Sequence, residues 1–234
     1  KKRRTGVLVV TLVIIAARAP HAALIDWPMI ILNPREPGPG ELVLDACAQH
    51  DVKVITRVVD YGGLFHDDLR PGGAMGERDH RAFRPEGWIA AGQEKIARMR
   101  PVAERHGLTT LQLACAWNLG HEAVETVVPT LIQEAGPGAR AIEDKRAELA
   151  AIGAWDASPL ARADVDAIRA IGDNRGCMAL KGASTEHEGP ERADRWGLDS
   201  ELAATAQRWG IDPERDLVRA GEHDGKRQMI GGAR

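Results

Sequence analysis

Two short apolar runs, each ending in a loop suited to an anion, constrain the fold of this chain most. The first, Val52–Val59, is rich in β-branched residues and runs into Asp60-Tyr61-Gly62-Gly63-Leu64. The second, Ala123–Val128, ends at Pro129-Thr130, ahead of a helix that begins near Arg140. β-Branched runs bounded by turn residues predict strands, and adjacent glycines let the backbone approach a ligand closely. Because helical patterns lie between the runs, we expect an α/β fold with a parallel sheet and ligand loops at the carboxyl ends of its strands.

The segments around these runs continue the alternation. A further strand is predicted over Ile25–Leu32, followed by a short helix over Glu41–His50. Apolar residues at helical spacing predict a helix over Trp88–His106, which Pro101 is expected to kink or divide. Thr109 or Thr110 is expected to cap the next helix.

Length, charge and cysteines limit the class of protein. The 234 residues lie near the lower end of the range for a (β/α)₈ barrel, which is typically ~250 residues. A net charge of −3 argues against nucleic-acid binding and favours a protein that handles small molecules. Cys47, Cys115 and Cys177 form no C-x-x-C motif, which favours a reducing cytoplasm and inert thiols, with Cys47 and Cys115 buried on apolar helix faces.

Several of these segments resemble one family. VITRVVDYGGLF resembles the seventh strand and loop of aldo/keto reductases, V-I-A-[RY]-S-P-L-x-G-G-L. TVVPTLIQEAGPGARAIEDK resembles the eighth, T-V-I-P-G followed by [RQ]-x-I-x-E-N, and Ile25–Leu32 resembles the sixth. Residues 103–108 and 111–117 resemble the family's A-E-x-H-G-[VL]-[ST]-x-x-Q-L-A-L-A-W helix pair. The resemblance implies a TIM-type (β/α) barrel, partial or truncated here, with residues 1–152 as the barrel portion and 153–234 as a helical extension packed on it.

The same resemblance implies a cofactor site at the two strand ends. The family reduces an aldehyde or ketone by hydride transfer from a nicotinamide cofactor, so we expect NADPH and a small carbonyl substrate. Backbone N–H groups of a glycine loop favour phosphate, and the planar fork of an Arg suits it also. The expected cofactor-binding residues are Arg57, Asp60, Gly62, Gly63, Leu64, Pro129, Thr130, Arg140 and Lys145.

Each of these residues has an expected place along the cofactor. The loop with Gly62 and Gly63 would pass under the pyrophosphate, and Arg57 would lie on the nicotinamide side. Arg140 and Lys145 would neutralise a 2′-phosphate; an ordinary charged first helical turn is the alternative. Two positions depart from the family pattern: Asp60 puts a carboxylate near a pyrophosphate, and Lys145 replaces the usual Asn.

The catalytic residues remain unassigned. In the family the Asp, Tyr, Lys and His that transfer the proton come from the first four strands, which have no counterpart in this sequence. Tyr61 is the sole tyrosine, but it follows the seventh-strand match and no Lys or Asp stands at matching spacing. The polar segment from His66 to Trp88 is read as a lid or, equally, as a solvated loop. Its acidic and histidine side chains are read as solvated charges in preference to a metal cluster, and no metal is predicted.

The two ends of the chain leave alternatives open. Residues 1–20 have the layout of a secretory signal, with a buried strand as the favoured alternative, and their apolar run is short for a membrane span. Asp164–Ile171 is predicted as a helix, and RWGLDSE at 195 recurs as RWGIDPE at 208. Three hypotheses follow: a cytoplasmic reductase, a catalytically silent relative that binds dinucleotide or acts as an interaction module and completes its sheet by self-association, and an exported protein.

Overall fold

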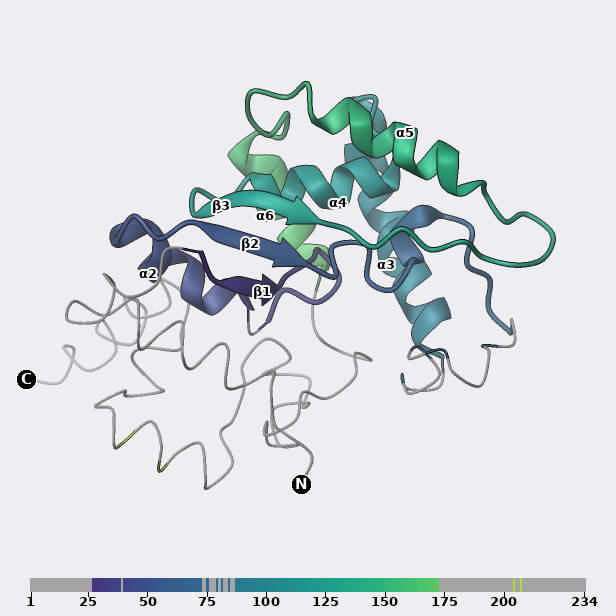
Figure 1. The fold of residues 1–234 in the computed structure, drawn as a ribbon, viewed down its shortest axis with the longest axis horizontal. Helices are drawn as coiled ribbons and strands as arrows, with labels where there is room; N and C mark the ends of the chain where they lie inside the picture. The colour runs from purple at the N-terminus through teal and green to yellow at the C-terminus, as the bar shows by residue number, and fades with distance from the viewer. Residues whose placement is uncertain are drawn as a thin grey trace, which may run out of the picture.

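Three parallel strands form the sheet of this protein. The computed structural model describes residues 27–38, 40–72, 75, 79, 81, 84, 87–172, 204 and 207. The strands are β1 (Met29–Ile31), β2 (Val54–Arg57) and β3 (Val124–Val128), in the order β1-β2-β3. Figure 1 shows them side by side and pointing the same way. All three expected strands and their parallel arrangement are confirmed, each shorter than its apolar run.

The register of the strands separates two faces of the sheet. Ile30 pairs with Thr56, and both are buried. On the alternate positions, Met29 pairs with Ile55, and Arg57 lies between Ile31 and Val128. Successive side chains of a strand point to opposite faces, so this second set shares a face. The carboxyl ends of the strands meet at one edge, from which the predicted ligand loops depart.

Helices pack against this sheet and against one another. The helix α4 lies along β3, α5 packs on α4, and α6 packs on α3 (Figure 1). The Trp117 indole N–H of α4 donates to the Val165 carbonyl of α6 at 3.1 Å, which ties these two helices together in the core. The helical elements are η2 (Gly40–Val43), α2 (Leu44–Gln49), η3 (Leu64–His66), α3 (Trp88–Arg105), α4 (Thr110–Leu119), α5 (Ile142–Ile152) and α6 (Arg162–Ile171).

Pro101 does not divide its helix. The helix α3 continues unbroken on both sides of it, so the expected division is wrong. Pro101 is exposed, whereas Ile96, Met99 and Val102 form a buried stripe. Packing of that stripe stabilises the helix against the loss of one backbone hydrogen bond at its solvent side.

Thr109 caps α4 as expected. Its side-chain oxygen accepts a hydrogen bond from the backbone N–H of Gln112, and the Gln112 side chain accepts one from the N–H of Thr109. This reciprocal pair is a capping box, which satisfies two donors at the start of the helix. The helix therefore begins where the sequence places its first apolar turn.

Two cysteines lie in the core, as predicted. Cys47 and Cys115 are buried free thiols. Burial raises the pKa of Cys47 to about 11 and that of Cys115 to about 12, so both stay protonated at neutral pH. Cys177 lies outside the described residues, as do residues 1–20 and the repeated RWG segments.

The helix α6 is anchored on the segment that follows β1. Arg169 forms a buried two-pronged ion pair with Glu41, at 2.6 and 2.5 Å, and donates to the Gly172 carbonyl at 2.7 Å. A Cβ at Gly172 would overlap the Pro34 carbonyl oxygen, so the two backbones are in close contact. The predicted helix over Asp164–Ile171 is confirmed, and the domain boundary at residue 152 stays a prediction. Within the part of the chain that the structure describes, no helix has the length and apolar content to cross a membrane.

Candidate functional site

The loops that follow β1 and β2 are joined at the carboxyl edge of the sheet. Asn33 organises the first loop, because its side-chain oxygen accepts from the backbone N–H groups of Arg35 (3.0 Å) and Glu36 (2.8 Å). Its amide nitrogen donates to the Val58 carbonyl at 3.1 Å. Val58 has a φ of 58°, an unfavourable conformation for a β-branched residue, so this bond holds a strained residue at the end of β2.

Asp60 joins the second of these loops to the third. Its side chain is fully buried, and its two oxygens accept hydrogen bonds from two different loops. One accepts from the Gly63 N–H and the other from the Thr130 N–H, each at 2.8 Å. Gly62 and Gly63 have φ values of 67° and 92°, which glycine adopts without strain and which turn the chain back toward Asp60.

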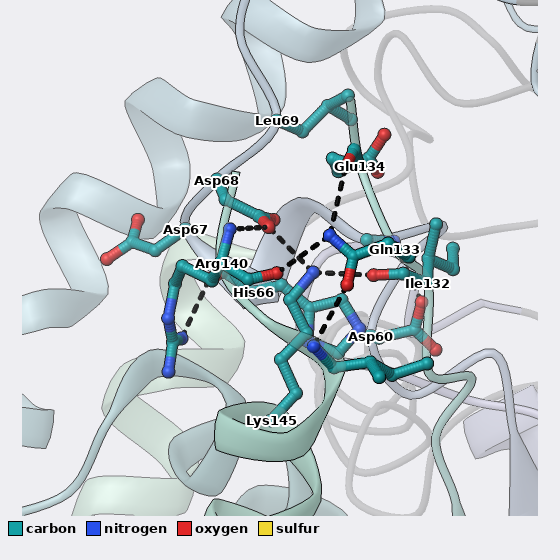
Figure 2. A network of polar contacts seen from close by, with 12 residues as sticks. Asp60, His66, Asp67, Asp68, Leu69, Ile132, Gln133, Glu134, Arg140 and Lys145 are labelled. Atoms are coloured by element: carbon teal, nitrogen blue, oxygen red, sulfur yellow. Dashed lines mark hydrogen bonds and ion pairs between the residues drawn. The ribbon is translucent and has the colours of Figure 1, made fainter. Parts of the chain in front are cut away.

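Lys145 and Asp68 form a fully buried ion pair beside this junction. The Lys145 Nζ lies 2.6 Å from an Asp68 carboxylate oxygen, and neither side chain is exposed. The ammonium also donates to the Ile132 carbonyl at 2.5 Å. The same Asp68 oxygen accepts from the Arg140 backbone N–H at 3.0 Å. Figure 2 shows Lys145 extending from its helix toward both partners, so its charge is neutralised inside the protein.

Arg140 is held at the margin of the same site. Its guanidinium donates to the His66 carbonyl at 3.0 Å and pairs with Glu148, whose hydrogen bond raises the pKa of Arg140. The ring N–H of His66 donates to the Thr130 carbonyl at 2.8 Å, and Gln133 accepts from the Ile142 N–H at the start of α5. We call the following set the strand-end network: Asp60, Gly63, His66, Asp68, Thr130, Ile132, Arg140 and Lys145.

Arg81 and Arg84 of the 66–88 segment lie against residues 60–64, which we call the glycine loop. Arg81 donates to the Gly62 carbonyl at 3.2 Å and forms ion pairs with Asp79 and Glu134. A Cβ on Gly63 would lie 3.1 Å from the Glu134 carboxylate, so this acidic side chain lies directly over the loop. Described residues of the 66–88 segment therefore contact the predicted pyrophosphate loop, and its role as a lid stays a prediction.

Tyr61 is enclosed by the same segment. It is fully buried, meets Trp88 edge-on at 6.0 Å between ring centroids, and has the Arg84 guanidinium 4.3 Å above its ring. Nearby, burial raises the pKa of Glu36 to about 7, while the charges of Arg84 and Arg35 lower it in part. Glu36 therefore changes its protonation near neutral pH.

The structure brings most predicted site residues together. Asp60, Gly63, Thr130, Arg140 and Lys145 belong to the strand-end network, Gly62 adjoins it, and Pro129 precedes Thr130. Leu64 instead packs in the core against α3, and Arg57 is exposed on the sheet face at the end of β2. That any of these residues binds a cofactor stays a prediction.

Sequence reasoning missed the acidic partners of the network. Asp68 and Glu148 pair with Lys145 and Arg140, the two cations that were expected to meet phosphate, and Glu134 pairs with Arg81. Of the acidic and histidine side chains of the 66–88 segment, Asp67 pairs with Arg100 at 2.9 Å, and His80 lies outside the described residues. Among the residues described, no group of three or more His, Cys, Asp or Glu side chains could hold a metal ion.

The donors of the site fit a nucleotide in part. Thr130 is exposed and the Arg140 side chain is 31% exposed, so a phosphate from solvent can reach both. Lys145 is inaccessible, and the Gly63 and Thr130 N–H groups already donate to Asp60. Near Arg140 the site therefore offers accessible donors, whereas the donors of the glycine loop already bind the Asp60 carboxylate.

Comparison with known proteins finds one family whose match includes the site residues from Asp60 to Ile132 but not Arg140 or Lys145. Residues 28–135 match the model of the aldo/keto reductase family. The solved glycerol dehydrogenase AKR11B4 from Gluconobacter oxydans is similar at 15% identity and a TM-score of 0.49, over 62% of this chain and 41% of that chain. The holo form of aldo-keto reductase AKR11C1 from Bacillus halodurans is similar at 18% identity and a TM-score of 0.40, over 70% and 45%. The match thus spans less than half the length of either structure; among curated proteins, none matches.

Proposed function

From the match of residues 28–135 to the aldo/keto reductase family, we propose that this chain acts as an NADPH-dependent carbonyl reductase. The substrate class would be small aldehydes or ketones. The three strands and their helices would be the sixth to eighth units of a (β/α)₈ barrel. The buried, protonated thiols of Cys47 and Cys115 favour a cytoplasmic protein.

The observation that carries this proposal is that the loops after β2 and β3 meet in the strand-end network, and that Asn33 joins the loop after β1 to the end of β2. Ligands of parallel α/β proteins bind at this edge of the sheet. Arg140 and Thr130 would hold the adenosine phosphate at the exposed margin, because both are accessible there. Arg57 would lie against the nicotinamide end, since it is exposed at the end of the central strand.

The bound cofactor would supply a hydride to the carbonyl carbon of the substrate. The chain's own residues would bind and orient it, and the carbonyl oxygen requires a proton from elsewhere. Tyr61 does not serve as that donor, because it is fully buried beneath Arg84 and against Trp88. Lys145 does not approach the reacting atoms either, since its ammonium is enclosed by Asp68 and Ile132.

Titration with NADPH and NADH tests the proposal. Binding is followed by tryptophan fluorescence and by energy transfer to the nicotinamide, in the intact chain and in Arg140→Ala. Loss of a charge-assisted contact to the 2′-phosphate should weaken NADPH binding at least about tenfold and leave NADH binding nearly unchanged. The control is Arg162→Ala, an exposed arginine on α6.

The outcomes separate the proposal from its alternatives. Binding of NADPH, its loss in Arg140→Ala and turnover of simple aldehydes would together support a reductase. Binding without turnover would instead indicate a dinucleotide-binding relative. Failure of the intact chain to bind either dinucleotide would contradict the proposal.

A further inference from the structure

We propose that Asp60 is a specificity-determining residue that keeps external anions out of the glycine loop. This inference rests on the proposed function in one respect, that a dinucleotide pyrophosphate is the anion to be held there. The glycine loop is defined as residues 60–64. Backbone N–H groups converge there as in an anion-binding site, and the anion that they bind is the carboxylate of Asp60 itself.

The hydrogen bonds of Asp60 carry the first step. Backbone N–H groups in successive turn conformations form concave sites for anions. Here the two N–H groups that converge, from Gly63 and Thr130, each donate at 2.8 Å to a separate oxygen of one carboxylate. Because Asp60 is fully buried, solvent does not screen its charge. An incoming phosphate would find both donors engaged and a negative charge behind them.

Glu134 adds a second negative charge at the same loop. Its carboxylate lies within contact distance of a Cβ built on Gly63, and it pairs with Arg81. Arg81 is shared with Asp79 at 2.7 Å and is almost fully buried, so it offers little positive charge to a ligand. Repulsion between like charges at a few ångströms in a poorly screened site outweighs what an external anion would gain from two donors that already bind Asp60.

Neutralising Asp60 should therefore create anion binding at this loop. In Asp60→Asn the amide oxygen accepts from one N–H, and the amide nitrogen becomes a donor. The loop keeps a side chain of the same size and loses its buried charge. We expect at least about tenfold tighter binding of inorganic pyrophosphate, and of NADPH, than in the unaltered chain. Asp67→Asn is the matched control, because it removes the same charge from the same segment at a half-exposed pair with Arg100.

The test uses the full chain and reads two signals. Affinities for pyrophosphate and NADPH are measured by calorimetry, and the amide signals of Gly63 and Thr130 are followed by NMR. In Asp60→Asn, pyrophosphate should shift both amide signals; in the unaltered chain and in Asp67→Asn it should shift neither at millimolar concentration. Should Asp60→Asn fail to fold, the unaltered chain still decides, since displacement of Asp60 by pyrophosphate would shift both amides.

The outcomes also separate this inference from the proposed function. Equal pyrophosphate affinity in the unaltered chain and Asp60→Asn would overturn the role of Asp60, whatever NADPH does. A gain in pyrophosphate binding in Asp60→Asn, with no NADPH binding by any variant, would support the role of Asp60 and contradict the proposed reductase.

Discussion

Glu36 lies buried in the loop after β1, and its ionisation should make the protein's stability depend on pH. Burial raises its pKa from the usual 4.5 to about 7, and the charges of Arg84 and Arg35 offset this only in part. The folded state thus holds the proton more tightly than the unfolded chain does. Stability is therefore greatest below about pH 4.5 with respect to this group, and falls as the pH rises through 7, by roughly 3 kcal/mol in all.

Urea unfolding at pH 5 and pH 8 measures this effect. Glu36→Gln removes this titration. Relative to the unaltered chain, the variant should therefore be more stable at pH 8 than it is at pH 5. Glu94→Gln, at an exposed position of α3, is the control. A difference between Glu36→Gln and the unaltered chain that stays constant across this range would contradict the prediction.

Lys145, which was predicted to bind a phosphate, instead stabilises the fold through its buried ion pair with Asp68. Its partner Asp68 is equally buried, so Lys145→Met leaves a carboxylate without its counterion in the interior. We expect a loss of about 3–5 kcal/mol in urea unfolding, partly recovered in Lys145→Met combined with Asp68→Asn. Arg162→Met, which breaks an exposed pair on α6, should cost less than about 0.5 kcal/mol. Equal effects of Lys145→Met and Arg162→Met would refute this assignment.

At the scale of elements, the contact between α6 and the loop after β1 is the most sensitive to a single methyl group. A Cβ at Gly172 would overlap the Pro34 carbonyl oxygen, a backbone atom that cannot rotate away. Gly172→Ala should therefore destabilise by roughly 1–3 kcal/mol, measured by thermal and urea unfolding. Gly153→Ala is the matched control, because its Cβ would lie 3.4 Å from the nearest oxygen and its φ is −60°. A loss in Gly172→Ala no greater than in Gly153→Ala would show that the contact is loose.

The elements themselves could be predicted from local pattern, whereas their connections could not. The helix α3 carries an apolar period, α4 is a largely apolar segment that begins at a capping box, and each strand lies inside its apolar run. The strand-end network instead joins residues far apart in sequence, such as His66 with Thr130 and Asp60 with Thr130. Periodicity contains no information on such pairs. The sequence therefore predicts Lys145 as a phosphate ligand, and only the fold shows that Asp68 neutralises its charge.

At the scale of the whole molecule, the three-stranded sheet leaves apolar side chains exposed. Trp27, Met29 and Val128 are 51%, 46% and 46% exposed, and within the described residues β1 and β3 each pair only with β2. Parallel sheets are almost always covered on both faces, and open strand edges invite pairing with another chain. We therefore expect self-association that strengthens with concentration, through this face and these edges.

Sedimentation velocity over about a hundredfold range of concentration tests this expectation. Val128→Lys places a charge on the exposed face at the end of β3 and should shift the chain toward monomer. Ala150→Lys makes the same kind of change on the exposed side of α5 and should leave the distribution unaltered. If the chain stays monomeric at every concentration, the exposed apolar face does not cause self-association, and the prediction is wrong. If Val128→Lys yields monomer and also abolishes NADPH binding, the strand-end network depends on a second copy for its function; retained binding would place the whole cofactor site within one chain.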